Sequence, residues 1–186
     1  MKDFDKRLNK GQELNDFFND FLVNNKLSYI ESGYEFNKDY YNAINLIKNK
    51  NDKTSKFVRY YPDKTLTGKS KSILIEVKNS SGIEKECYEN YLSLINNLNI
   101  EILFLLKNKK LCKCQDLKFN DVNEYDIKAK MKIPVIDKVW KAPRLLNEYD
   151  YQNYLKAYKY KTSGCSFAFI DFKNTKFYEL NVLLKL

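Results

Sequence analysis

The chain has 186 residues, enough for one well-buried core or for a core with a small appendage. Hydrophobic residues make up 44% of it, which excludes a chain that is disordered throughout, and the few glycines (5) and prolines (3) disfavour a turn-rich β-sandwich. The formal net charge of +9 favours a polyanionic partner, so a nucleic acid is the expected one.

The first part of the chain predicts a helix followed by strands. Five apolar residues between 10 and 24 recur at helical spacing and predict an amphipathic helix over that range. A strand, a short helix, a polar loop, a second strand and a third strand are expected next, with a turn centred on Gly68 before the third. Their ranges are 27–36, 39–50, 49–56, 57–63 and 72–80.

The middle of the chain predicts a helix between two buried elements. Residues 82–98 carry apolar side chains on one helical face, and 100–107 are a continuous apolar run typical of a strand covered on both faces. A further strand is expected at 109–119. The order of these elements predicts an α/β fold with a mixed β-sheet flanked by helices.

The pattern weakens beyond residue 120. We expect a connector over 120–144, a helix over 145–160 and a β-hairpin formed by 166–172 and 176–184, turning at Lys173–Lys176. The predicted domains are therefore a core over 1–120 and a C-terminal extension over 121–186, which is either packed on the core or a small unit of its own.

Histidine is absent, and its absence excludes Ser-His-Asp and Cys-His catalysis, His-ligated zinc and nucleases with a histidine base. Hydrolytic chemistry would have to use carboxylates, lysine or tyrosine, most simply with a hard divalent metal. No apolar run reaches the ~18–20 residues that span a bilayer, and the charged start is unlike a signal peptide. We therefore expect a cytoplasmic protein with no membrane segment and with reduced cysteines, of which Cys87 is a core thiol.

Charged residues that could meet at one site lie between 63 and 78. In the strand 72–80, Glu76 and Lys78 share one face while Ile73, Ile75 and Val77 share the other. Hairpin pairing would bring Asp63 beside Glu76, and two carboxylates forced together require a cation between them. Asp63, Glu76 and the Val77 carbonyl would hold Mg²⁺ or Mn²⁺, and Lys78 would position or help deprotonate the attacking water. The alternative is a solvated hairpin with an exposed ion pair.

The stretch Pro62-Asp63, a spacer of 12 residues and then Glu76-Val77-Lys78 resembles the PD-(D/E)xK signature of the restriction-endonuclease-like nuclease superfamily. The flanking helices and strands are similar to the αβββαβ core of that superfamily, over roughly residues 10–119. The resemblance implies a Mg²⁺-dependent (or Mn²⁺-dependent) nuclease. It also implies an auxiliary acid on the first helix, a role that we carry to Glu13, although Asp16 and Asp20 lie on the same helix.

Basic residues near the motif and in the extension are candidates for nucleic-acid contacts. Arg59 would share a strand face with Asp63, and Lys85 begins the helix after the motif. The stretch YLKAYKYKTSG interleaves tyrosine with lysine, as a surface that holds phosphates and stacks on bases would. Its candidate residues are Lys156, Lys159 and Lys161.

The sequence thus predicts a metal-dependent endonuclease that acts on DNA, of a restriction, junction-resolving or mobile-element type, with RNA left open as a substrate. Cutting both strands with one site per chain calls for two copies, which would fit a homodimer. Two alternatives stay open. One is a non-catalytic nucleic-acid-binding module, and the other is a phage or mobile-element interaction protein whose positive charge reflects codon bias.

Overall fold

The computed structural model describes residues 2–32, 52–121, 125–126, 131–132 and 167–186. The chain divides into two compact units. The first comprises Met1–Ser81, Asn90–Leu117 and Lys176–Leu186, and the second comprises Gly82–Glu89 and Lys118–Thr175. The helices predicted at 39–50 and 145–160 and most of the predicted connector lie outside the described residues.

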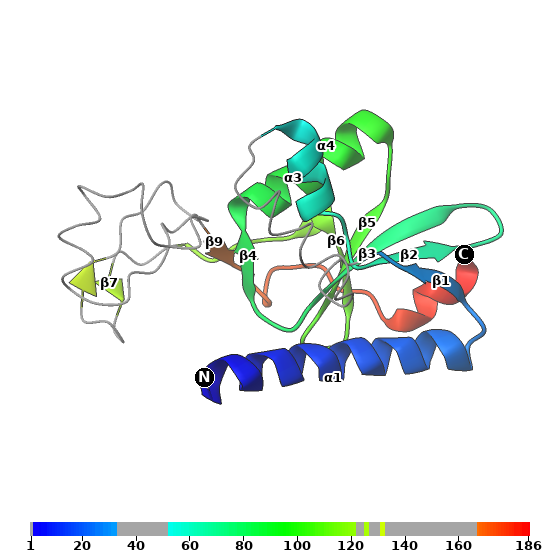
Figure 1. Cartoon of the computed structure of the whole chain (residues 1–186), viewed down its shortest axis with the longest axis horizontal. Helices are drawn as coiled ribbons and strands as arrows, with labels where there is room; N and C mark the ends of the chain where they lie inside the picture. Colours follow the sequence, from blue (N-terminus) through cyan, green and yellow to red (C-terminus); the bar gives the residue numbers. More distant parts are fainter. Residues whose placement is uncertain (1, 33–51, 122–124, 127–130, 133–166) are drawn as a thin grey trace. The chain divides into compact units, whose positions relative to one another are not determined.

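A five-stranded sheet forms the centre of the first unit (Figure 1). Its strands lie in the order β1-β2-β3-β5-β6, with β3 and β5 parallel and the other neighbours antiparallel. The prediction of an α/β fold on a mixed sheet is confirmed. The strands are β1 (Ser28–Glu31), β2 (Lys64–Thr67), β3 (Ser72–Lys78), β5 (Ile102–Leu106) and β6 (Leu111–Lys113).

Helices cover both faces of this sheet (Figure 1). Helix α1 (Lys2–Asn24) lies on one face, and α3 (Lys53–Arg59) and α4 (Lys85–Leu98) lie on the other. The order α1, β1, β2, β3, α4, β5 confirms the expected αβββαβ succession, with α3 and β4 as additions. The core under α1 includes apolar residues from the helix and from the two central strands. They are Leu14, Phe18 and Leu22 of α1, Ile73 and Ile75 of β3, and Leu103 and Leu105 of β5.

Helix α1 confirms the helix predicted at 10–24 and begins earlier, at Lys2. It ends where Lys26 adopts a left-handed conformation (φ 54°), and the Leu27 amide donates to the Leu22 carbonyl at 2.9 Å. This arrangement is a Schellman cap, which satisfies a terminal carbonyl and turns the chain into β1. Although α1 has 23 residues, neither it nor any other helix of the described ranges is both long and apolar enough to cross a membrane.

The segment predicted as a strand at 57–63 is instead the end of a helix, and that prediction is wrong. Helix α3 begins after Asp52, whose side chain accepts a hydrogen bond from the Ser55 amide at 2.9 Å. This N-cap hydrogen bond satisfies an amide in the first turn, which has no acceptor within the helix. The β-prone residues Phe57 and Val58 are therefore helical, and the hairpin is formed by β2 and β3. Strand β2 starts and ends later than the strand expected at 57–63, whereas β3 starts at residue 72 as expected and ends at Lys78.

Predictions for the ends of the other elements are partly wrong. The strand expected at 109–119 is short, because β6 gives way to a 3₁₀ helix at Cys114–Asp116. The hairpin expected from 166–172 and 176–184 does not form: Leu180–Lys185 is a 3₁₀ helix, and Tyr178 forms a bridge with Leu111 in the first unit. In the second unit, β4 (Gly82–Glu84) pairs with β9 (Phe167–Phe169), and β7 (Tyr125–Asp126) pairs with β8 (Met131–Lys132).

Substituting alanine for either of two glycines in the first unit is expected to change the free energy of unfolding in opposite directions. A Cβ on Gly68, in the β2–β3 turn, would lie 2.6 Å from the Leu186 carbonyl oxygen, whereas a Cβ on Gly11, in α1, would have no heavy atom within 4 Å. Gly68→Ala is expected to lower the free energy of unfolding by about 1–3 kcal/mol, because the backbone of Leu186 would have to move.

Gly11→Ala is the matched control and is expected to raise the free energy of unfolding by about 0.5–1 kcal/mol, because alanine restricts the unfolded chain and favours helix. Urea denaturation monitored by circular dichroism measures both. Equal effects of the two substitutions would contradict the close approach of Leu186 to the β2–β3 turn.

Candidate functional site

The Pro62-Asp63 pair lies between α3 and β2 and is held by hydrogen bonds from the end of β1. The Ser32 amide donates to the Asp63 carbonyl at 2.8 Å, and the Ser32 hydroxyl donates to the Pro62 carbonyl at 2.9 Å. Proline offers no amide proton to a neighbouring strand, so the ladder can stop there without losing a donor. The backbone of Asp63 is therefore fixed just where β2 begins.

The Asp63 carboxylate binds the neighbouring strand of the motif. Its Oδ2 accepts a hydrogen bond from the Val77 amide at 2.7 Å. The β2–β3 ladder pairs Lys64 with Ile75, so the next position along the antiparallel register places Asp63 opposite Glu76. The side chain of Asp63 thus receives the β3 amide beyond the last pair of the ladder, at the end of β3 that carries Glu76 and Lys78.

Glu76 and Lys78 lie on the face of β3 opposite to α1. Ile73, Ile75 and Val77 contact the core under α1, and strand alternation places Glu76 and Lys78 on the other face. Both charged side chains are half-buried. The parallel pairing of β3 with β5 places Glu76 beside Phe104 and Lys78 beside Leu106, so apolar residues of β5 flank both charged residues.

Tyr91 of α4 binds Glu76 from the helix layer above the sheet. Its hydroxyl donates to Glu76 Oε2 at 2.7 Å, and its ring lies 5.7 Å from the Phe104 ring between centroids. Tyr91 is only 1% exposed, so this hydrogen bond is shielded from water. The periodicity of the helix placed Tyr91 on an apolar face, and nothing in the sequence indicated that its hydroxyl would bind the motif glutamate.

An ion pair with a buried lysine lies directly beside Asp63 on the α1 side of the sheet. Lys64 has no exposed side-chain surface, and its Nζ lies 2.5 Å from Glu31 Oε1 of β1, its cross-strand partner. The Tyr29 ring centroid lies 5.4 Å from the same Nζ. Lys64 follows Asp63 in sequence, so the two side chains point to opposite faces, and the ion pair fixes the first residue of β2.

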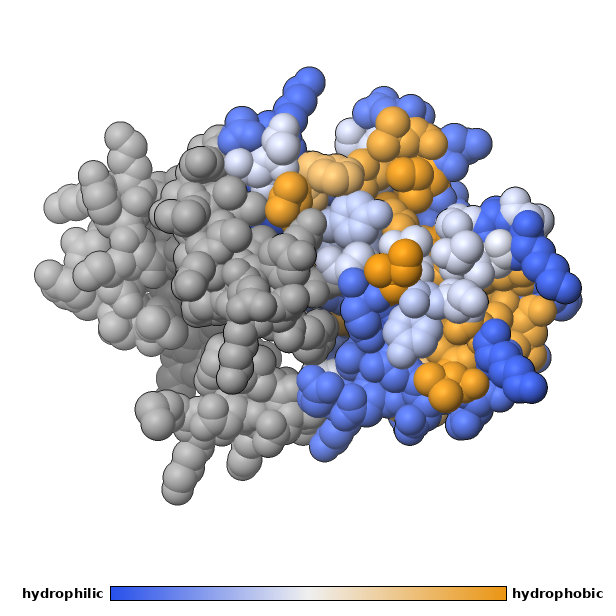
Figure 2. Space-filling view, turned by 45° about the vertical axis from the view of Figure 1, so that its right-hand side comes forward, coloured by the Kyte–Doolittle hydropathy of each residue, from blue (hydrophilic) through white to orange (hydrophobic). Residues whose placement is uncertain are grey.

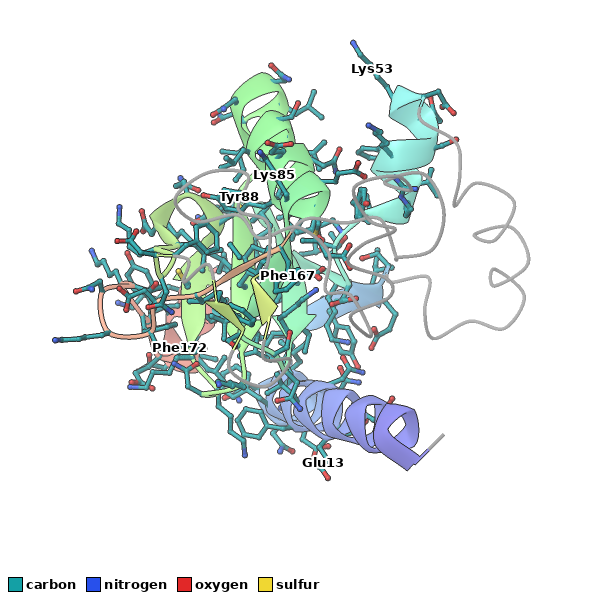
Figure 3. The ribbon with its side chains drawn as sticks, turned by 90° about the vertical axis from the view of Figure 1, so that its left-hand side faces the viewer. Glu13, Lys53, Lys85, Tyr88, Phe167 and Phe172 are labelled. Atoms are coloured by element: carbon teal, nitrogen blue, oxygen red, sulfur yellow. The ribbon has the colours of Figure 1, made fainter. Side chains whose placement is uncertain are left out.

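The auxiliary acid expected on the first helix does not lie near Asp63 and Glu76. Glu13 is exposed, and Figure 3 shows it on the side of α1 that faces away from the sheet. The buried polar residue of α1 is Asn15, whose Oδ1 has no hydrogen-bond partner among the described residues. The role assigned to Glu13 stays a prediction.

The residues predicted to contact nucleic acid lie in several places. Arg59 belongs to the last turn of α3, over the Tyr60 ring at 4.7 Å, so the strand face that it was expected to share with Asp63 does not exist. Lys85 is the first residue of α4 and lies 3.9 Å from Glu89 in an ion pair. Lys156, Lys159 and Lys161 lie outside the described residues.

The cysteines of the described chain are core residues. Cys87, Cys112 and Cys114 are buried and free of disulfides, which confirms the expectation for Cys87. Burial raises the pKa of the Cys112 and Cys114 thiols to about 12, with Asp116 adding to the effect at Cys112. Thiols with so high a pKa are neutral at physiological pH, as buried core thiols are.

The donors available to a metal at this site are oxygens. The described residues contain no group of three or more His, Cys, Asp or Glu side chains placed to hold one ion. Asp63 and Glu76 would supply two carboxylates from neighbouring strand positions, and the Val77 carbonyl is the third oxygen that the sequence predicts. Hard oxygen donors in this number fit Mg²⁺, which keeps several waters when it binds to proteins.

Comparison with known proteins adds little. No family model matches the sequence, and no curated protein matches it. Among solved structures, the chain is similar to Hjc, a Holliday junction resolvase of the archaeal hyperthermophile Archaeoglobus fulgidus, with 13% sequence identity and a TM-score of 0.36. The match covers 59% of this chain and 76% of the resolvase. A likeness of that size assigns neither a fold nor a function to this chain.

Proposed function

We propose that the chain is a metal-dependent nuclease that hydrolyses phosphodiester bonds of DNA, with its site at the end of β3. The observation that carries the proposal is the hydrogen bond from the Val77 amide to Asp63. This contact joins the two halves of the motif at the end of β3 that carries Glu76 and Lys78. The hydrogen bond holds the Asp63 carboxylate in one position at the end of β3. An aspartate without a functional role would not require its side chain to be fixed in this way.

Asp63, Glu76 and the Val77 carbonyl would hold the divalent cation. The amide and carbonyl of one strand residue point to the same neighbouring strand, so the Val77 carbonyl points to the side of β3 on which Asp63 lies. When bound, a divalent cation neutralises charge on phosphate oxygens and lowers the pKa of water, so that hydroxide is available near neutral pH.

The protein groups around this position have separate tasks. The Tyr91 hydroxyl donates to one oxygen of Glu76, which fixes the orientation of the carboxylate. Lys78, on the same face of β3, offers an ammonium that can hold a phosphate oxygen or orient the attacking water. The net charge of +9 attracts a polyanion over a long range, which favours DNA as the substrate.

A cleavage assay tests the proposal. Purified protein would be incubated with supercoiled, linear and branched DNA and with single-stranded RNA, in Mg²⁺ or Mn²⁺ and in EDTA. We expect cutting that requires the metal and is lost in Asp63→Asn. Asparagine can still accept the Val77 hydrogen bond, so this substitution removes the charge and keeps the local shape. Asp121→Asn, at an exposed position of the second unit, is the matched control and should cut like the wild type.

The outcome that would reject the nuclease is folded wild-type protein that binds DNA but cuts no substrate in either metal. A salt-sensitive binding that is unchanged in Asp63→Asn would then identify a non-catalytic nucleic-acid-binding module. A gel-filtration measurement of the wild type alone and with DNA would show in the same preparation whether the expected homodimer forms.

A further inference from the structure

Helix α3 presents a basic and aromatic face that has no part in the site described above. Lys53 and Phe57 are exposed and four residues apart, so they lie on one side of the helix, and Lys56 lies beside them. The opposite side is turned inward, where Ser55 is buried and Val58 is half-buried. Figure 3 shows Lys53 extending away from the helix into solvent.

The charge of α3 has one sign. Its basic residues are Lys53, Lys56 and Arg59, and its first turn contains no acid. The carboxylate of Asp52, just before the helix, is engaged by the Ser55 amide. A surface of this kind attracts an anion with repeated charges, and phosphates along a nucleic-acid strand have such a pattern.

Phe57, like Phe169 of the second unit, is an exposed aromatic residue with a second ring against it, and Phe57 is the one that lies beside lysines on a helix near the motif. Figure 2 shows apolar and hydrophilic side chains interspersed on one face, and isolated apolar residues of that kind are normal. Phe57, however, is 37% exposed and has a second aromatic ring against it: the Tyr61 ring lies 5.3 Å away, edge to face. Exposed aromatic rings beside lysines are the usual means of stacking on unpaired bases.

The aromatic pair is joined to the motif by a short and ordered connection. The Tyr60 amide donates to the Lys56 carbonyl, the Tyr61 amide donates to the Val58 carbonyl, and Ser32 holds Pro62 and Asp63. Asp63 is six positions after Phe57 in sequence, so their Cα atoms are at most ~22 Å apart. A strand that contacts α3 therefore lies within a few nucleotides of the site.

We propose that this face of α3 binds an unpaired segment of the nucleic-acid substrate, an inference that rests on the proposed nuclease function. Phe57, supported by Tyr61, stacks on a base, and Lys53 and Lys56 contact phosphates on the same strand. The substrate class is thus DNA with a single-stranded stretch beside the cut, since a base inside a duplex is not available for stacking.

Fluorescence anisotropy in EDTA tests the inference without cleavage. The probes are a fluorescein-labelled single-stranded DNA, its complementary duplex and an RNA strand of the same sequence. Phe57→Leu, which stays apolar and removes the aromatic ring, is expected to weaken single-strand binding roughly tenfold and to leave duplex binding unchanged. Lys53→Gln/Lys56→Gln is expected to lower the slope of log K against log salt by about 1.4 for the single strand.

Lys69→Gln is the control, because Lys69 is an exposed lysine in the β2–β3 turn of the same unit. Single-strand affinities of both α3 variants equal to that of the control would overturn the inference, and so would an equal loss on duplex and single strand. Because binding is read in EDTA, a protein that fails to cut in Mg²⁺ does not affect this result. Wild-type cutting together with unaltered binding by the α3 variants would reject the role of α3 alone.

Discussion

Lys78→Ala is expected to reduce metal-dependent cleavage by about 10²–10³-fold while leaving metal binding intact, because the ammonium acts on the substrate or the water and is no ligand of the cation. Asp63→Asn is expected to lose both, since it removes a carboxylate from the two that the site supplies. Isothermal titration with Mn²⁺ measures the binding, and single-turnover cleavage with saturating protein measures the rate. The pair of variants thus separates the two functions of the motif.

Lys69→Ala is the matched control for Lys78→Ala, because it removes a lysine at the opposite end of the same hairpin. Thermal unfolding of each variant shows whether the fold is kept. Cleavage by Lys78→Ala at the rate of Lys69→Ala would exclude Lys78 from the reaction. Loss of Mn²⁺ binding in a folded Lys78→Ala protein would show instead that the lysine shapes the metal site.

The parts of the fold that could be predicted depend on short-range periodicity. The alternation along β3 separated Ile73 and Ile75 from Glu76 and Lys78, and the structure confirms this division because Ile73 and Ile75 belong to the core under α1 while Glu76 binds Tyr91 of α4. The unbroken apolar run of β5 indicated a strand covered on both faces, and all five of its residues are buried. The alternation of side chains along a strand can be recognised from neighbouring residues alone, without knowing which distant residues pack against them.

The predictions that failed involve competition between local signals or pairing over long distances. Phe57 and Val58 have high β-propensity, yet the cap at Asp52 and the packing of Ser55 favour a helix. The Asp52-to-Ser55 signal was present in the sequence, within a stretch interpreted as a polar loop. The pairing of β9 with β4 joins segments far apart along the chain, and no local pattern specifies such a partner.

In the candidate site, too, local features could be predicted from the sequence and contacts between distant residues could not. The three charged residues of the motif were evident from their spacing, whereas the groups that hold them were not. Ser32 fixes the backbone at Asp63, and Tyr91 binds Glu76, each through one hydrogen bond to a residue distant in sequence. Serine and tyrosine occur throughout a chain with this composition, so only the folded structure identifies these two as supports of the site.

Glu31→Ala is expected to lower the free energy of unfolding by about 3 kcal/mol, because it leaves the buried ammonium of Lys64 without a compensating charge. Lys64 has 0% side-chain exposure, whereas Glu31 is 43% exposed, so the loss should lie at the lower end of the range for buried pairs. Urea denaturation measures the change. Cleavage should fall as well, since Lys64 begins β2 directly after Asp63.

Glu179→Ala is the matched control, because Glu179 also pairs with a lysine, Lys110, at 2.6 Å, but both side chains are largely exposed. That pair is expected to contribute less than about 1 kcal/mol, so burial and not distance decides the size of the effect. The double variant Glu31→Ala/Lys64→Met removes the buried charge and should recover most of the stability and the cleavage. Equal small losses in the two single variants would show that water reaches Lys64, and a double variant as unstable as Glu31→Ala would show that the loss does not come from the unpaired charge.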